Sequence, residues 1–399
     1  MPYYIGDVIK DSKRLIARTP EKFEETGIQV RLNTRVEGIE IDRGTVLLAG
    51  GGRIPYDALV VATGAAATLP DIPGTNLDGV FVLKNLRDGL NIKEYIKSNK
   101  CRKAAVVGAG FIAMEMGEAL KTLGLETRIV YRGELPVKKW DPAFSAVVLE
   151  ELTNNGVTFM AHQSPVAVEK GSQARLSLVT DKEKIETGII IFALGVRPDT
   201  KLAREAGLAV GESGAIRVDS SQRTSREEIF AAGDCCESYH RVSKRWVHIP
   251  LGDIANKQGR VAGRNIGGYP TTFPGVVGAQ CFKVFGLEVA MTGLDEKGAE
   301  RSGYAPASTI IWGNPVAPSI SEGHRLGLKL IADKTSGKLL GAQAVGQGGA
   351  VGRINTLSAC LWSGMGLDEI GYMDLAYSPP FGGAWDAIHT AAQVLKKQL

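Results

Sequence analysis

Residues 108–113 read Gly-Ala-Gly-Phe-Ile-Ala, a G-x-G-x-x-A motif that holds a dinucleotide pyrophosphate when it joins a strand to a helix. An apolar run precedes the motif and a helical pattern follows it. Gly108 allows the tight turn, Gly110 lets the backbone approach the pyrophosphate, and Ala113 permits close packing of helix on sheet. The alternative is a glycine turn in an unrelated α/β domain, and the strand–helix context disfavours it.

The end of the next predicted strand indicates which nucleotide binds. NAD-binding domains place an acidic residue there, where it binds the ribose hydroxyls. This chain instead has Val130-Tyr131-Arg132, and a guanidinium suits a 2′-phosphate. We therefore expect NADPH in preference to NADH, with a merely solvated Arg132 as the alternative.

The elements around the motif alternate between strand and helix patterns, which predicts a parallel sheet. The predicted strands are 28–32, 44–48, 56–63, 103–110, 126–132, 188–195, 227–234, 308–313 and 325–346. The predicted helices are 7–26 (broken at Thr19-Pro20-Glu21), 111–124, 141–156 and 350–364.

Composition narrows the function classes. A chain of 399 residues suggests two to three domains. The net charge of +4 comes without a Lys/Arg run, so we expect no nucleic-acid partner. No apolar run reaches 18 residues, so we expect no membrane span. The five cysteines are scattered, without C-x-x-C or zinc spacing, which predicts no metal site and fits a reducing cytoplasm.

Further segments resemble the flavin-contact motifs of two-dinucleotide-binding flavoproteins. Ala62-Thr63-Gly64 resembles their ATG loop, and 229–235 (IFAAGDC) resembles the strand whose terminal Asp bonds the ribityl chain and pyrophosphate of FAD. Residues 195–198 (GVRP) resemble the return turn from the nicotinamide domain, and 248–260 the helix beside the isoalloxazine. Residues 337–346 and 376–381 resemble a dimerisation domain.

Together these motifs resemble the coenzyme A-disulfide reductase and NADH oxidase group of the FAD-dependent pyridine nucleotide-disulfide oxidoreductases, over essentially the whole chain. The resemblance implies an α/β fold with two Rossmann-like domains and an α+β dimerisation domain, in a homodimer. It implies an FAD-binding domain at 1–84 and 203–270, an NAD(P)-binding domain at 85–202 and a dimerisation domain at 271–399. Its cofactors would be FAD and NADPH (or NADH), bound by Val36, Thr63, Gly64, Gly108, Gly110, Ile112, Ala113, Glu115, Tyr131, Arg132, Gly195, Gly233, Asp234, Leu251, Gly252, Ala255 and Phe381.

The opening residues resemble part of another motif of this group. The group's segment Cys-Gly-x-Pro-Tyr-Tyr-Ile-Gly carries the redox cysteine, and here Pro2 to Gly6 match it with Met1 at x. We therefore expect the redox cysteine, the first flavin strand and the flavin's glycine loop to lie upstream of residue 1. None of the five cysteines present fits the redox role, and we interpret Cys235-Cys236 as structural because a bond between adjacent residues is strained.

In this group the flavin takes a hydride from NAD(P)H and reduces a cysteine, whose thiolate attacks a disulfide, peroxide or persulfide. The resemblance favours coenzyme A disulfide or persulfide as substrate. It implies that Tyr377 stabilises the leaving thiolate in the partner's active site, with a plain interface aromatic as the alternative.

Lys10, Arg14 and Arg18 are spaced four apart, so on the predicted helix they would share one face. That face suits the 3′-phosphate-ADP of coenzyme A, with a solvated helix face as the alternative. Two other functions stay open. One is an NADH oxidase or peroxidase on the same scaffold, and the other is a non-catalytic remnant that binds FAD weakly or not at all.

Overall fold

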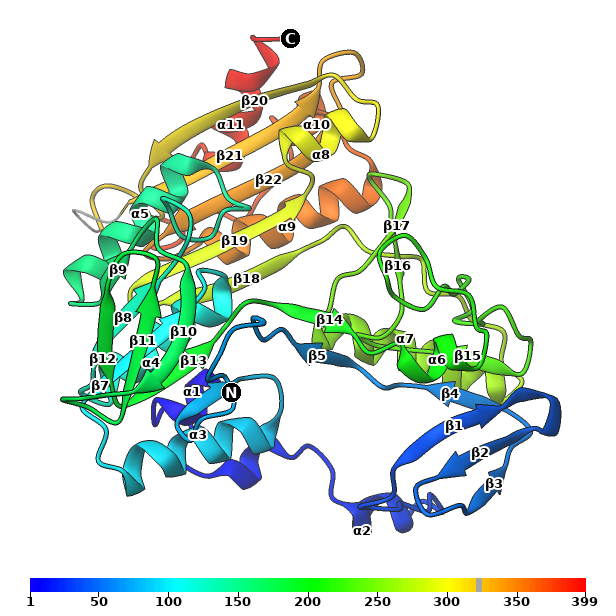
Figure 1. Ribbon diagram of the computed structural model, residues 1–399. Helices are drawn as coiled ribbons and strands as arrows, with labels where there is room; N and C mark the ends of the chain where they lie inside the picture. The colour runs from blue at the N-terminus through cyan, green and yellow to red at the C-terminus, as the bar shows by residue number, and fades with distance from the viewer. Residues whose placement is uncertain (321–324) are drawn as a thin grey trace.

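The computed structural model describes residues 1–320 and 325–399. Figure 1 shows three groups of elements. We call them the parallel-sheet unit (residues 80–192), the split unit (residues 36–61 and 199–266) and the C-terminal unit (residues 280–399). This arrangement confirms the predicted α/β fold class.

The parallel-sheet unit contains five parallel strands in the order β6-β13-β7-β8-β9. They are β6 (Val80–Val82), β13 (Ile189–Phe192), β7 (Lys103–Val107), β8 (Glu126–Val130) and β9 (Thr158–Met160). The interior strand β13, between β6 and β7, is wholly buried, which explains its uninterrupted apolar sequence. Helices of this unit are α3 (Leu86–Ser98), α4 (Phe111–Thr122) and α5 (Pro142–Asn154). A second, antiparallel sheet joins β10 (Pro165–Lys170), β11 (Leu176–Thr180) and β12 (Lys184–Thr187).

The split unit is assembled from two stretches of the chain. Strand β4 (Leu59–Val61) pairs in parallel with β15 (Ile229–Ala231). The other elements are β1 (Val36–Glu40), β2 (Thr45–Leu48), β3 (Arg53–Pro55), α6 (Lys201–Glu205), β16 (Ser238–His240), β17 (Arg245–Val247) and α7 (Gly252–Ile266). Two crossing strands, β5 (Ala65–Ala67) and β14 (Val196–Pro198), pair antiparallel and connect this unit to the parallel-sheet unit (Figure 1).

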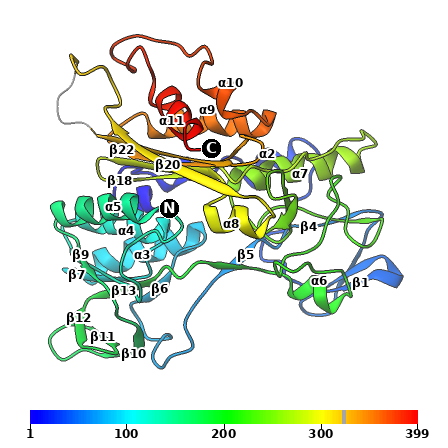
Figure 2. The same cartoon turned by 90° about the horizontal axis from the view of Figure 1, so that it is seen from above.

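The C-terminal unit is built on an antiparallel sheet in the order β18-β19-β22-β21-β20. Its strands are β18 (Gln280–Val284), β19 (Leu287–Gly293), β22 (Leu339–Gly346), β21 (Leu326–Asp333) and β20 (Pro306–Gly313). Its helices are α8 (Glu296–Arg301), α9 (Ala350–Ser363), α10 (Leu367–Ile370) and α11 (Ala387–Lys396). Figure 2 shows α9, α10 and α11 on one side of the sheet and α4, α5 and α8 on the other. Because both faces are covered, β21 and β22 are buried along their whole length.

A buried ion cluster fixes the parallel-sheet unit against the C-terminal unit. Lys329 of β21 is 5% exposed, and its Nζ lies 2.7 Å from the Asp141 carboxylate at the start of α5 and also contacts the Glu296 carboxylate of α8. Gln343 of β22 accepts a bond from the Asp141 backbone N–H at 2.7 Å. The relative position of the two units is therefore specified by polar contacts as well as by apolar packing.

Two predictions near the N-terminus are wrong. Residues 7–26 form no continuous helix: the chain has α1 (Pro2–Ile5), a 3₁₀ turn at Ser12–Leu15 and α2 (Pro20–Glu24). Asp7 has a φ of 63°, which helical backbone excludes, and residues 7–35 are mostly exposed, so no core stabilises a longer helix. The predicted strand 28–32 has no partner strand and is largely exposed. The other predicted strands and helices are confirmed, most with shorter bounds and with 325–346 divided into β21 and β22.

Candidate active site

The glycine turn between β7 and α4 forms an anion cradle. Gly108 has a φ of +121°, and a Cβ there would lie 2.4 Å from the Ala193 carbonyl oxygen, so the turn requires glycine. Gly110 is the N-cap of α4 and has no side-chain capping bond. A Cβ on Gly110 would meet nothing within 4 Å. The first N–H groups of a 12-residue helix therefore point into open space, which suits a pyrophosphate.

The surroundings of the turn hold it in place. Ala113 is fully buried where α4 packs on the sheet, and Ile112 is half-buried. Val137 has a φ of +47°, an uncommon conformation for a β-branched residue, and its N–H donates to the Ala109 carbonyl at 2.8 Å. The strained backbone of Val137 therefore supplies the hydrogen bond that supports the glycine turn.

At the end of β8 the predicted nucleotide-selecting residues have different exposures. Tyr131 is half-buried, with its ring centroid 6.3 Å from that of Phe159. Arg132 is exposed, so its guanidinium is available to a ligand at this end of the sheet. The residue that follows Val137, Lys138, is a second exposed cation beside the cradle. Sequence reasoning missed Lys138 because a tertiary contact, the Val137–Ala109 bond, brings this loop back to the glycine turn.

One turn into α4, Glu115 meets a residue from the N-terminus. The Tyr3 hydroxyl donates to Glu115 Oε1 at 3.3 Å. Burial raises the pKa of Glu115 above its usual value. Burial and the neighbouring carboxylate together raise the pKa of Tyr3 to about 12. The pair can therefore hold a proton at neutral pH beside the cradle.

A second cradle lies where the crossing strands β5 and β14 leave the split unit. The Thr63 hydroxyl donates to the Asp199 carbonyl at 2.6 Å. The Asp199 N–H donates to the Gly64 carbonyl at 2.9 Å, and Gly64 has a φ of +72°. Gly195, at the opposite end of the β5–β14 ribbon, has a φ of +93°, and a Cβ on either glycine would meet nothing within 4 Å. Both turns thus leave backbone open to a ligand.

Gly233 and Asp234 follow β15 at the same edge of the split unit. Gly233 has a φ of +86°, and a Cβ there would lie 3.4 Å from the Ala255 Cβ of α7, so strand and helix approach closely. The Asp234 carboxylate is 2.6 Å from Lys84 Nζ, and its carbonyl lies 2.8 Å from His248 Nε2. Sequence reasoning missed Lys84, because no local pattern relates it to a residue 150 positions away.

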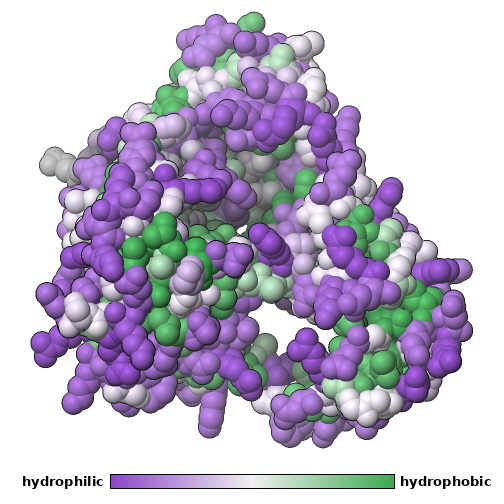
Figure 3. Space-filling model, in the orientation of Figure 1, coloured by the Kyte–Doolittle hydropathy of each residue, from purple (hydrophilic) through white to green (hydrophobic). Residues whose placement is uncertain are grey.

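Helix α7 begins beside these residues with an open N-terminus. Its N-cap Leu251 makes no side-chain capping bond, and a Cβ on Gly252 would meet nothing within 4 Å. Nearby, Val60 of β4 is 38% exposed, and Figure 3 shows apolar side chains gathered over the β4 and β15 region. Uncapped N–H groups, a carboxylate and uncovered apolar surface fit the isoalloxazine and ribityl parts of FAD.

The vicinal cysteines after Asp234 are core residues. Cys235 is fully buried, with Sγ 3.3 Å from the Val61 carbonyl oxygen. The hydrogen bond with Cys236 lowers the pKa of Cys235 to about 7, and burial opposes that shift. The same contact and burial raise the pKa of Cys236. Of the other thiols Cys101 is half-buried, Cys360 buried and Cys281 exposed. Among the described residues no cluster of His, Cys, Asp or Glu could hold a metal ion.

The predicted substrate residues are more scattered. Lys10, Arg14 and Arg18 are exposed, but they do not share a helix face because Lys10 and Arg18 lie outside the 3₁₀ turn that contains Arg14. Tyr377 and Phe381 are 58% and 77% exposed on the segment before α11. Val36 begins β1 and is half-buried.

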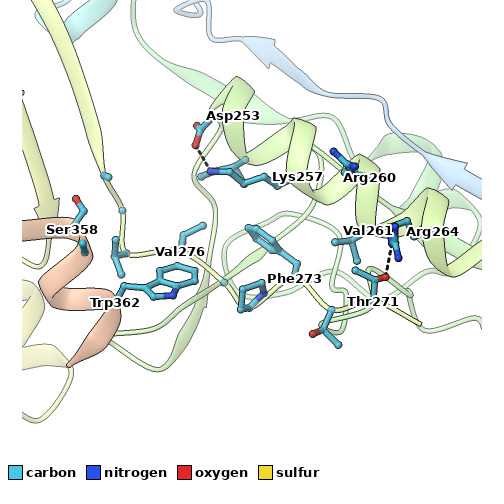
Figure 4. A pocket seen from close by; sticks show the side chains of 18 residues that line it. Asp253, Lys257, Arg260, Val261, Arg264, Thr271, Phe273, Val276, Ser358 and Trp362 are labelled. Carbon is cyan, nitrogen blue, oxygen red and sulfur yellow. Dashed lines mark hydrogen bonds and ion pairs between the residues drawn. The ribbon is translucent and has the colours of Figure 1, made fainter. Parts of the chain in front are cut away.

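Below α7 lies the cavity drawn in Figure 4. Its volume is about 740 Å³, and it separates α7 from the loop 271–279 and from the last turns of α9. Lys257 and Arg264 come from the α7 wall, while Phe273, Val276 and Trp362 come from the opposite side (Figure 4). The cavity runs along most of α7, from Asp253 in its first turn to Arg264 in its last.

Two sequence profiles match the chain. One describes a pyridine nucleotide-disulphide oxidoreductase and covers residues 5–259. The other describes the dimerisation domain of the same proteins and covers residues 279–388.

The chain belongs to the pyridine nucleotide-disulphide oxidoreductase family. This confirms the resemblance seen in the sequence. The oxidoreductases of this family are FAD- and NAD(P)H-dependent enzymes, which agrees with the two cradles. No helix among the described residues has the length and apolarity needed to cross a membrane.

Individual relatives make the likeness more specific. A Pyrococcus furiosus NAD(P)H sulfur oxidoreductase (CoA-dependent) is 34% identical over 398 residues, 98% of this chain and 89% of that protein. The structure of an NAD-dependent persulfide reductase from A. fulgidus is similar with a TM-score of 0.95 at 34% identity, covering 100% of this chain and 75% of the other. An engineered water-forming NADPH oxidase derived from the Lactobacillus brevis enzyme gives a TM-score of 0.93 at 26% identity, covering 100% and 89%.

Proposed function

We propose that this family member uses NADPH to reduce the sulfur–sulfur bond of coenzyme A disulfide or persulfide, as a cytoplasmic homodimer. One observation carries the proposal: two uncapped helix N-termini, those of α4 and α7, each face open space beside a glycine turn. The ribbon of β5 and β14 joins the two cradles, so a nicotinamide and a flavin have separate but connected sites. The overall reaction consumes NADPH, one proton and the S–S bond. It yields NADP⁺ with two thiols from the disulfide, or with one thiol and hydrogen sulfide from the persulfide.

The preference for NADPH rests on the exposed cations beside the first cradle. The engineered oxidase that binds NADPH carries five substitutions, the first of which is Gly→Ala. The others are Asp→Ala 18 positions later, Ala→Arg after 19, Met→Ser after 20 and Pro→Arg after 25. Counted from Ala113, the same spacings in this chain reach Tyr131, Arg132, Gly133 and Lys138. At this spacing the chain has a neutral residue and two cations, the same kinds of side chain that the variant acquired at the first, second and fourth of these spacings. We assign Arg132 and Lys138 to the 2′-phosphate.

The residues of the second cradle would hold the flavin. Asp234 would accept bonds from the ribityl hydroxyls, and Lys84 would hold that carboxylate in place. The backbone around Thr63, Gly64, Gly195 and Gly233 would approach the cofactor closely, and the α7 N-terminus at Leu251 and Gly252 would stabilise negative charge on the ring. Ala255 and Val36 would complete the contacts. Bound FAD supplies two-electron chemistry between the nicotinamide and a sulfur centre.

Glu115 and Tyr3 would form a hydrogen-bonded pair next to the nicotinamide site. The Tyr3 hydroxyl is protonated at neutral pH and donates its proton in the hydrogen bond to Glu115. The leaving thiolate of the substrate requires a proton or a hydrogen bond, and Tyr377 of a partner subunit would provide the hydrogen bond. The redox cysteine expected upstream of residue 1 stays a prediction.

The sulfur substrate is suggested by the two 34% identical relatives, a CoA-dependent sulfur oxidoreductase and a persulfide reductase. Lys10, Arg14 and Arg18 are exposed cations near the N-terminus, and they remain our candidates for the phosphates of coenzyme A, though not as one helix face. Oxygen is the rival acceptor because of the likeness to the water-forming oxidase.

An anaerobic and an aerobic assay of NADPH consumption separate the two acceptors. We expect coenzyme A disulfide or persulfide to drive consumption without oxygen, and NADPH to be preferred over NADH. Consumption that depends on oxygen and ignores every sulfur substrate would overturn the proposed substrate class.

A further inference from the structure

The cavity under α7 is an apolar surface without a cover in the described chain. Its walls are mainly carbon, and among its lining residues Trp362 of α9 is 41% exposed. One face of Trp362 is already occupied by the Arg241 guanidinium, 4.4 Å from the ring centroid. A hollow of about 740 Å³ with an aromatic wall and the cations Lys257, Arg260 and Arg264 at α7 suits an inserted aromatic side chain.

The same C-terminal unit exposes aromatic side chains on another surface. In the segment that leads into α11, Trp385 is 60% exposed and Tyr372 is 76% exposed, with their ring centroids 6.2 Å apart. The segment is held rigidly, because Arg353 of α9 is 2.6 Å from the Asp386 carboxylate. Large exposed aromatic clusters in soluble proteins commonly mark a protein interface.

Helix α9 links the two surfaces. Arg353, next to the aromatic segment, is in its first turn, whereas Ala359 and Trp362 at the cavity are in its last turns, about 13 Å further along the axis. Its exposed positions carry no charge, as expected of an interface centre: Gly352, Asn355, Ala359, Trp362 and Ser363. In a two-fold dimer with α9 antiparallel to its counterpart, the beginning of one α9 lies beside the end of the other.

We propose that the cavity under α7 is the receptor for Trp385 of a second copy of this chain, in an isologous dimer across α9. The match of residues 279–388 to a dimerisation domain identifies the second copy as the occupant, because that match includes both α9 and the aromatic segment. This inference rests on the homodimer of the proposed function. It adds that the cavity under α7 of one subunit contacts the aromatic segment of the other. Tyr377 is eight residues before Trp385. The same contact therefore brings Tyr377 toward the N-terminus of helix α7 in the partner subunit.

Sedimentation of the 399-residue chain tests the contact without any turnover assay. We expect the wild-type protein to be a dimer, and Ala359→Glu or Trp385→Arg each to raise the dimer dissociation constant at least about 30-fold, the effect of an interface hot spot. Combining both substitutions places opposite charges at the proposed contact and should recover at least about tenfold of that loss. Val166→Glu, a charge placed on an exposed apolar residue of β10, is the matched control and should change the constant by less than about twofold.

Circular dichroism of each variant confirms that the fold is intact before the constants are compared. A monomeric wild-type protein, single variants that dimerise normally, or a double variant as weak as the sum of the singles would each overturn the contact. Reduction of bound flavin by NADPH is measured on the same samples. That reaction fails only if the proposed function fails, so the two failures are distinguishable.

Discussion

Replacing Gly110 by alanine gives the sharpest test of the nucleotide cradle. The Gly110 backbone has φ −80° and ψ 179°, which alanine adopts without strain, and its Cβ would meet no protein atom within 4 Å. We therefore expect the melting temperature to stay unchanged. The added methyl group would occupy the space in front of α4 where we place the pyrophosphate. Loss of two hydrogen bonds to a charged group costs about 3–6 kcal/mol, at least about a 100-fold weaker affinity for NADPH.

Gly108→Ala should behave differently two residues away. Its φ of +121° and the 2.4 Å approach to the Ala193 carbonyl force the turn to move. The conformational strain alone costs about 1–3 kcal/mol, so this variant should lose both stability and NADPH affinity. Gly263→Ala is the matched control, because this exposed glycine within α7 has open space around its Cβ position and should tolerate the change in both respects.

Calorimetric titration with NADP⁺ and thermal unfolding measure both quantities on the same samples. The reasoning is refuted if Gly110→Ala binds NADP⁺ as tightly as the wild type, since a pyrophosphate on the α4 N-terminus cannot coexist with that methyl group. It is also refuted if Gly108→Ala is as stable as Gly110→Ala.

Three further predictions concern specificity, stability and chemistry. Arg132→Ala should lower the preference for NADPH over NADH in steady-state kinetics about 10- to 100-fold, and an unchanged ratio would exclude Arg132 from the 2′-phosphate. Lys329→Met leaves the Glu296 carboxylate without its buried cation and should lower the free energy of unfolding by about 2–4 kcal/mol at pH 7. Burial raises the pKa of Glu296, but bonds from Lys329 and Ser308 outweigh it, so its folded pKa is below normal. That stabilisation exists above pH about 4.3 and is lost as pH falls, so urea titrations of the two proteins should converge in acid; a constant difference would contradict the pairing. Tyr377→Phe should leave flavin reduction by NADPH intact and slow turnover of the sulfur substrate about 10- to 100-fold, and equal turnover would remove Tyr377 from catalysis.

The parts of the fold that were predictable are those whose local pattern and burial agree. The buried strand β7, the glycine turn and α4 follow from an apolar run, Gly108 and Gly110, and a helical period. The residues 7–26 have a helical pattern too, but no core lies beside them, so only short turns form. Pattern alone does not reveal whether an amphipathic face has something to pack against.

The site was predictable where motifs are contiguous and not where distant segments meet. Gly233 and Asp234 could be singled out as candidates because they end a recognisable strand. Lys84, which pairs with Asp234, belongs to another unit, and Tyr3 reaches Glu115 across 112 positions. The Lys329 cluster is likewise formed by three elements distant in sequence. Such contacts are set by tertiary packing, which one sequence does not display.

The most direct test of the central claim is an anaerobic absorbance titration of the purified chain, supplied with FAD, by NADPH. We predict a bound flavin whose visible absorption band bleaches as NADPH approaches one equivalent, because the two cradles are connected and each fits its nucleotide. A chain that takes up no flavin, or a bound flavin that NADPH leaves oxidised, would contradict the account.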